Sequence, residues 1–134
     1  MPPTQFTREE ADELLPRLTQ LLAEMRERKT EYNRFAAQAV ELSDKMRGNG
    51  QLAQADLKGA QEGLEQAVAA LNGLGEQISE LGCELKDIDQ GLIDFRTEMD
   101  GKEVYLCWKL GEERVEWWHE LDTGFAGRQP LGQR

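Results

Sequence analysis

Apolar residues recur every three or four positions along the N-terminal part of the chain, first from Ala11 to Met46 and then from Leu57 to Leu81. Spacing of this kind, sustained over several turns, predicts two amphipathic helices with a coiled-coil-like seam. The seam positions are Ala11, Leu14, Leu18, Leu21, Met25, Tyr32, Phe35, Ala39, Leu42 and Met46 in the first run, and Leu57, Ala60, Leu64, Ala67, Leu71, Leu74, Ile78 and Leu81 in the second.

The break between the two runs is the sequence GNG, Gly48 to Gly50. Glycine stops a helix and permits the positive φ angles of a tight reversal, so we expect a turn at 48–50. Two long helices joined by so short a turn form an antiparallel helical hairpin.

The start of the first helix is marked by Thr7 and Glu10, which fit a capping box. Pro16 lies inside the helical pattern, where it removes one hydrogen bond and crowds the preceding turn. We therefore expect a kink or a break near residue 16. The kinked N-terminal helix would then be free to pack on whatever follows Gly82.

After Gly82 the period changes to two. The sequence KEVYLCWKL alternates between apolar and polar positions and predicts a strand with one apolar face. Asp100 and Gly101 are a hairpin signal before it, while GLIDF and RVEWWHEL read as neighbouring strands and CELKD as a possible fourth. The chain is thus predicted to be α+β, with the helical hairpin in residues 1–82 and a small C-terminal antiparallel β-meander in residues 83–134.

The chain has 134 residues and a net charge of -10, which argues against nucleic acid and anionic membranes as partners. Its N-terminus does not resemble a signal peptide, and no stretch approaches the roughly 18 apolar residues of a membrane span. We therefore expect a cytoplasmic protein. In that compartment Cys83 and Cys107 are expected to be reduced thiols.

Small residues accompany the seam of the second helix. Each glycine costs a helix about 1 kcal/mol relative to alanine, so the stripe favours close approach of another helix, most simply from a second copy of the chain. The alternative is an exposed helix whose composition has no such role. The stripe consists of Ala55, Gly59, Gly63, Ala70 and Gly73.

His119 is the single histidine and lies beside two tryptophans. The favoured interpretation is a partly buried histidine bonded to a carboxylate or carbonyl group, and the alternative is a general base or metal ligand. A mixed metal site would use His119 with Cys107 or Cys83 and an acid such as Asp122, but no CxxC spacing supports it. Cys107 could also be a nucleophile activated by His119. We predict no cofactor and favour no metal.

Other candidate ligand-binding residues are Arg128, Trp118, Asp94 and Asp87. Arg128 could bind an anion or, more in keeping with this acidic chain, pair internally with Asp94, Glu120 or Asp122. The aspartates near Gly91 are expected to cap a turn rather than perform acid–base chemistry. At least one tryptophan is expected to be exposed or to face a partner.

The opening FTREEADELLP, the stretch KD…GLIDF, the strand VYLCW, the pair WH and the closing GFAGRQPL resemble an uncharacterised bacterial family catalogued as domain of unknown function 2203. The resemblance implies a complete protein whose C-terminal third is its recognisable part. It brings no activity, cofactor or catalytic residue with it.

Together these features favour a non-enzymatic interaction or scaffold protein that forms a homodimer through its helices, with another protein as a possible further partner. The alternative is a small-molecule or metal-binding protein, whether an enzyme or not, with a site on the sheet around His119 and Arg128. The two hypotheses differ in whether the candidate side chains converge in one pocket or are paired internally.

Overall fold

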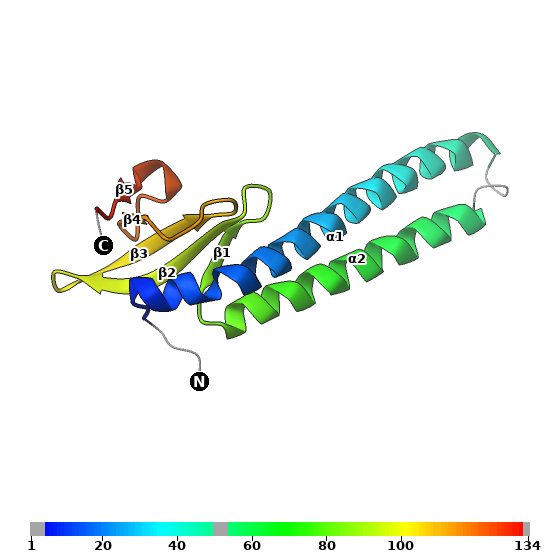
Figure 1. The fold of residues 1–134 in the computed structure, drawn as a ribbon. Coiled ribbons are helices and arrows are strands. Elements are labelled where there is room, and N and C mark those ends of the chain that lie inside the picture. Colours follow the sequence, from blue (N-terminus) through cyan, green and yellow to red (C-terminus); the bar gives the residue numbers. More distant parts are fainter. Residues whose placement is uncertain (1–4, 50–53, 133–134) are drawn as a thin grey trace. The chain divides into compact units, whose positions relative to one another are not determined.

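Two helices are followed by five strands in the computed structural model, which describes residues 5–49 and 54–132 (Figure 1). The elements are α1 (Arg8–Asn49), α2 (Gln54–Glu80), β1 (Glu84–Asp87), β2 (Leu92–Met99), β3 (Lys102–Lys109), β4 (Trp117–His119) and β5 (Gln129–Pro130), with a 3-10 helix η1 (Phe125–Gly127) before β5. The predicted α+β class, a helical hairpin followed by an antiparallel meander, is confirmed. Within the described ranges, neither helix has the length and apolar character needed to cross a membrane.

The chain divides into two compact units. The first combines the residues up to Ala23 with those from Gly75 onward, and so contains the sheet and one end of each helix. The second, Glu24–Leu74, is the rest of the hairpin. The boundary predicted at Gly82 marks where helix gives way to strand, whereas the compact units group the beginning of α1 and the end of α2 with the sheet.

The helix α1 begins as the capping box predicts. The Thr7 amide donates to Glu10 Oε1 at 2.8 Å, and the Glu10 amide donates to Thr7 Oγ1 at 3.1 Å. Of the two expected effects of Pro16, a kink or a break, the break does not occur, because α1 runs without interruption from Arg8 to Asn49. Pro16 is exposed while its neighbours Leu15 and Leu18 are buried, so the packing of the helix outweighs the lost hydrogen bond.

The turn predicted at 48–50 begins too early. Gly48 and Asn49 still belong to α1, because two residues of low helix propensity do not outweigh a long helix that precedes them. Gly50 lies outside the described residues. The described part of the chain resumes in α2 at Gln54.

The five strands are antiparallel and lie in chain order, β1-β2-β3-β4-β5. Asp100 and Gly101 both have positive φ, 52° and 77°, as a two-residue type I′ hairpin between β2 and β3 requires. Gln129 and Pro130 form β5 beside β4, an edge position where a proline without an N–H group is tolerated.

The sheet is buried on both faces, whereas one apolar face was predicted for β3. Every residue from Val104 to Trp108 is buried. On one face the ring of Phe6 packs edge-on against Phe95, with 5.3 Å between ring centroids. The Val115 amide also donates to Asp12 Oδ1 of α1 at 2.8 Å. The N-terminal segment and the first turns of α1 therefore cover this face, as was expected of the N-terminal helix.

The effect of Pro16 on the free energy of unfolding can be measured directly. We predict that Pro16→Ala raises the free energy of unfolding by about 1–3 kcal/mol, because alanine restores the amide donor inside a continuous helix. Gln20→Ala, an exposed change in the same helix, should alter it by no more than about 0.5 kcal/mol. Urea denaturation followed by circular dichroism measures both values. Equal stability of Pro16→Ala and wild type would contradict this account of α1.

Cys83 predicts a loss of stability in alkali. Its thiol is buried and donates to the Ile78 carbonyl at 3.6 Å, and burial raises its pKa from 9.0 to about 12, with the neighbouring Glu84 charge acting in the same direction. Between pH 9 and 12 the unfolded chain loses this proton while the folded chain keeps it, so stability falls as pH rises.

The loss should reach about 1.4 kcal/mol per pH unit for this thiol. Cys83→Ser removes this contribution, so the stability of wild type relative to the variant should decrease above pH 9. Denaturation curves collected from pH 8 to 11 in the presence of a reductant test this. A difference between the two proteins that stays constant with pH would be incompatible with a protonated buried thiol.

Candidate functional site

Three side chains capable of chemistry meet on the face of the sheet opposite to Phe6. Asp94 on β2 pairs directly with Cys107 on β3, and Tyr105 on β3 pairs with His119 on β4. Residues that are directly opposite or two apart share a face, so the register brings Asp94, Cys107 and His119 together. Their exposed fractions are only 3%, 1% and 2%, and one donor atom from each lies within 4.8 Å of the other two.

Both ring nitrogens of His119 have partners. Nδ1 lies 2.6 Å from the Glu120 carbonyl oxygen, and Nε2 lies 2.9 Å from Asp94 Oδ2. A carbonyl can only accept, so Nδ1 carries a proton. A second proton must then lie between Nε2 and the Asp94 carboxyl group, because two bare lone pairs would repel at this distance. Whichever of the two groups holds that proton, the pair has no net charge.

Cys107 completes the cluster as a protonated thiol. Burial raises the pKa of Asp94, and His119 and Cys107 oppose this by interacting with the carboxylate. Burial also raises the pKa of Cys107 to about 12, and the Asp94 charge adds to that effect while Arg128 acts against it. With a thiol that stays protonated at neutral pH and no free nitrogen on His119, the arrangement provides no activated nucleophile.

A cavity of about 140 Å³ lies against the cluster. Strand residues form its floor, and the segment that follows β4 contributes Gly124 and Phe125 to its wall. Its full lining is Lys86, Leu92, Asp94, Tyr105, Cys107, His119, Leu121, Gly124 and Phe125. The C-terminal segment thus helps to enclose the second face of the sheet, as the start of α1 encloses the first.

Arg128 is held by an internal partner. Its Nη2 lies 3.0 and 2.8 Å from the two carboxylate oxygens of Glu112, and its guanidinium group lies 4.5 Å from the Trp117 ring centroid and 4.7 Å from that of Phe125. Internal pairing was the preferred expectation, but Asp94, Glu120 and Asp122 were the expected partners. Glu112 lies in the turn after β3, a position that becomes a neighbour of Arg128 only once β5 pairs with β4.

The remaining candidates lie apart from the cluster. Asp87 Oδ1 accepts from the Gln90 amide at 2.9 Å and so caps the turn before β2. Trp118 pairs with Leu106, which places it on the face opposite to His119, and Asp122 is exposed in the turn after β4. The structure therefore brings together Asp94, Cys107 and His119, and separates Asp87, Trp118 and Asp122 from them.

Sequence reasoning missed a network of charged and polar groups at the edge of the same face. Glu84 accepts hydrogen bonds from Lys86 at 3.1 Å, from Arg96 at 3.0 Å and from the Tyr105 hydroxyl at 2.9 Å. These interactions lower the pKa of Glu84 against the opposing effect of its burial. Tyr105 and Cys107 are two residues apart in β3, so they lie on the same face of the sheet. This spacing is the one sequence signal that places Tyr105 on the face of the cluster.

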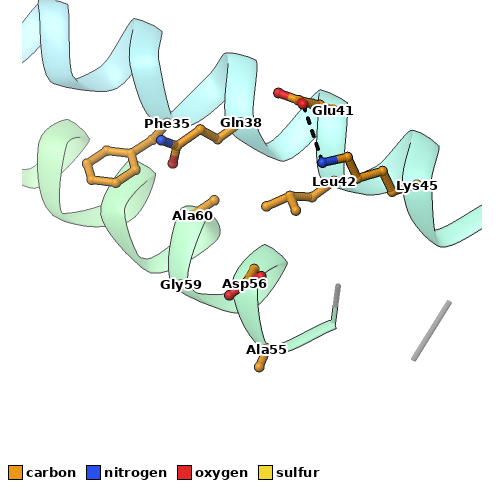
Figure 2. Close-up of a pocket in the computed structure, with 9 residues that line it drawn as sticks. All are labelled: Phe35, Gln38, Glu41, Leu42, Lys45, Ala55, Asp56, Gly59 and Ala60. Atoms are coloured by element: carbon orange, nitrogen blue, oxygen red, sulfur yellow. Dashed lines mark ion pairs between the residues drawn. The ribbon is translucent and has the colours of Figure 1, made fainter. Parts of the chain in front are cut away.

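The hairpin unit carries a separate groove of about 420 Å³ between α1 and α2. Figure 2 shows Phe35 and Leu42 on α1 facing Ala60 on α2, with the Glu41–Lys45 ion pair on α1 at the side. Gly63 lies under Phe35, and a Cβ atom there would come within 2.7 Å of the ring. The close approach at Gly63 is therefore made by α1 of the same chain.

The packing of Arg128 predicts that lysine cannot replace it. Arg128→Lys should lower the free energy of unfolding by about 1–3 kcal/mol, because a lysine ammonium cannot bind both Glu112 oxygens while stacking between two rings. Arg114→Lys, the same change at an exposed position five residues before His119, should cost no more than about 0.5 kcal/mol. Equal effects of the two substitutions in urea denaturation would contradict a structural role for the Arg128 stack.

Comparison with known proteins leads to a family without an assigned activity. At the level of individual proteins, the chain has no match among curated sequences and none among solved structures. Residues 4–131 match the family described as "Uncharacterized conserved protein (DUF2203)". The match spans the helical hairpin and the whole sheet, so the chain belongs to this family.

Proposed function

We propose that this chain is a non-enzymatic interaction protein that self-associates through its helical hairpin. The observation that carries the proposal is the incomplete burial of the hairpin's own seam. In the unit Glu24–Leu74 five large seam side chains are only partly buried: Phe35, Leu42, Leu57, Leu64 and Leu71. The buried apolar residues of this unit are Met25, Ala60, Ala67 and Leu74, two of which are alanines.

Two helices alone cannot cover a wide apolar stripe. Each buries one line of contact, and a stripe that extends beyond that line stays accessible to water. Tyr32 of the seam is 37% exposed, and Val68, which follows the seam residue Leu64 by one helical turn, is 41% exposed. Since burial of apolar surface contributes about 25 cal/mol per Å², a second hairpin that completes a four-helix arrangement would stabilise both copies.

The distribution of charge supports the same conclusion. Residues 24–74 carry seven basic and eight acidic side chains, a net charge of -1 out of -10 for the whole chain. Most of the acidic excess therefore lies outside the unit Glu24–Leu74, where it would not oppose the approach of two such units. Within the hairpin, residues 24–49 carry a net charge of +1 and residues 54–74 carry -2, so α1 of one copy and α2 of another are electrostatically compatible.

Sedimentation equilibrium tests this proposal. The wild-type chain should sediment at twice its mass of 15.2 kDa. Val68→Glu should weaken the dimer at least about tenfold, because a symmetric interface would bury the introduced carboxylate twice. Gln66→Glu adds the same charge at an exposed position of α2 two residues away and should leave the mass unchanged.

A wild-type chain that sediments at 15.2 kDa over the whole concentration range would overturn the proposal. So would equal dissociation constants for Val68→Glu and wild type. Circular dichroism of each variant establishes that the helices are intact before the masses are compared.

A further inference from the structure

We infer that Asp94, Cys107 and His119 form a binding site for one divalent transition-metal ion of the zinc class. The site lies on the sheet and is independent of the self-association proposed for the hairpin. Among the described residues, it is the group of histidine, cysteine and acidic side chains whose donor atoms come close enough to share an ion.

The donor set suits zinc. An imidazole nitrogen, a thiolate sulfur and a carboxylate oxygen are its three usual protein ligands, and a set of three leaves a fourth tetrahedral position open. Ligand atoms that share a zinc ion at bond lengths of about 2.0–2.3 Å lie about 3.5 Å apart. The donor atoms of the cluster already lie within 4.8 Å of one another, and each comes from a different strand of one sheet.

The charge of the cluster also fits a divalent ion. Without metal, the cluster holds a thiol proton on Cys107 and one proton between His119 and Asp94, and it has no net charge. A zinc ion with neutral His119, the Asp94 carboxylate and the Cys107 thiolate is again neutral. One divalent ion therefore replaces two protons, and no uncompensated charge is buried in either state.

The surroundings supply the other parts of a metal site. The bond from His119 Nδ1 to the Glu120 carbonyl fixes the imidazole so that Nε2 faces the cluster, which is the usual outer contact of a metal-binding histidine. The adjoining cavity of about 140 Å³ has room for a water molecule as the fourth ligand.

Titration of the chelator-treated full-length chain with Co²⁺ tests the site, because Co²⁺ occupies zinc sites and reports its ligands by absorption. We expect one Co²⁺ per chain, visible bands of tetrahedral Co²⁺ and a thiolate-to-cobalt charge-transfer band. Cys107→Ser should abolish the charge-transfer band and weaken binding at least about 100-fold, since even outer contacts of a metal site are worth 10–100-fold. Cys83→Ser removes the other buried cysteine, which lies outside the cluster, and should leave both unchanged.

A second readout needs no variant. Calorimetric titration with Zn²⁺ in buffers of different ionisation enthalpy should show the release of about two protons per ion bound. Failure of the wild-type chain to bind one ion overturns the inference, as does a charge-transfer band that survives Cys107→Ser or disappears with Cys83→Ser. If Cys107→Ser does not fold, His119→Gln serves in its place, and the wild-type stoichiometry and proton release decide the question.

Discussion

The buried Asp94 carboxyl group places the strictest constraint on this structure, because it lies in a sheet whose two faces are both covered. A buried carboxyl group without partners would cost several kcal/mol. Its partners come from the neighbouring strands: His119 Nε2 lies 2.9 Å from Asp94 Oδ2, and a donor atom of Cys107 lies within 4.8 Å. The cluster therefore connects β2, β3 and β4 with the segment that follows β4. A shift of one residue in either strand pairing would turn one partner to the opposite face.

Apolar side chains are buried in different ways in the two compact units. In the sheet unit, the segment before α1 covers one face with Phe6, and the C-terminal segment encloses the other with Phe125. In the hairpin unit, each helix has only the other to pack against, so large seam residues such as Leu64 and Leu71 are left partly exposed. The sheet unit is accordingly suited to an enclosed site for a small ligand, and the hairpin unit to contact with another protein.

Much of the fold follows from local features of the sequence. The apolar period identifies both helices, Thr7 and Glu10 mark the start of α1, and Asp100–Gly101 specifies the β2–β3 turn. Each of these signals acts between residues close in sequence. Pro16 does not end α1, because its cost is local, whereas the buried neighbours Leu15 and Leu18 are held by the rest of the fold, and Arg17 donates to Gln77 Oε1 of α2 at 2.8 Å.

The residues of the site could be predicted from the sequence, but their convergence could not. His119, Cys107 and Asp94 could each be named from their chemistry, and the expectation that His119 bonds to a carboxylate or carbonyl group describes both of its contacts. Their convergence depends on strand register, which no local pattern fixes across the segment between β3 and β4. The pairing of Arg128 with Glu112 depends in turn on β5, a strand of only two residues that no alternating pattern marks.

The hydrogen bonds of His119 hold the ring with Nδ1 protonated and with a second proton between Nε2 and Asp94. Because His119 is the single histidine in the chain, the ¹⁵N signals of its imidazole can be assigned without ambiguity. In chelator-treated protein the account predicts a protonated Nδ1 whose hydrogen exchanges slowly with solvent, and an Nε2 signal that changes in Asp94→Asn. An unprotonated Nδ1, or imidazole signals that are the same in wild type and Asp94→Asn, would contradict it.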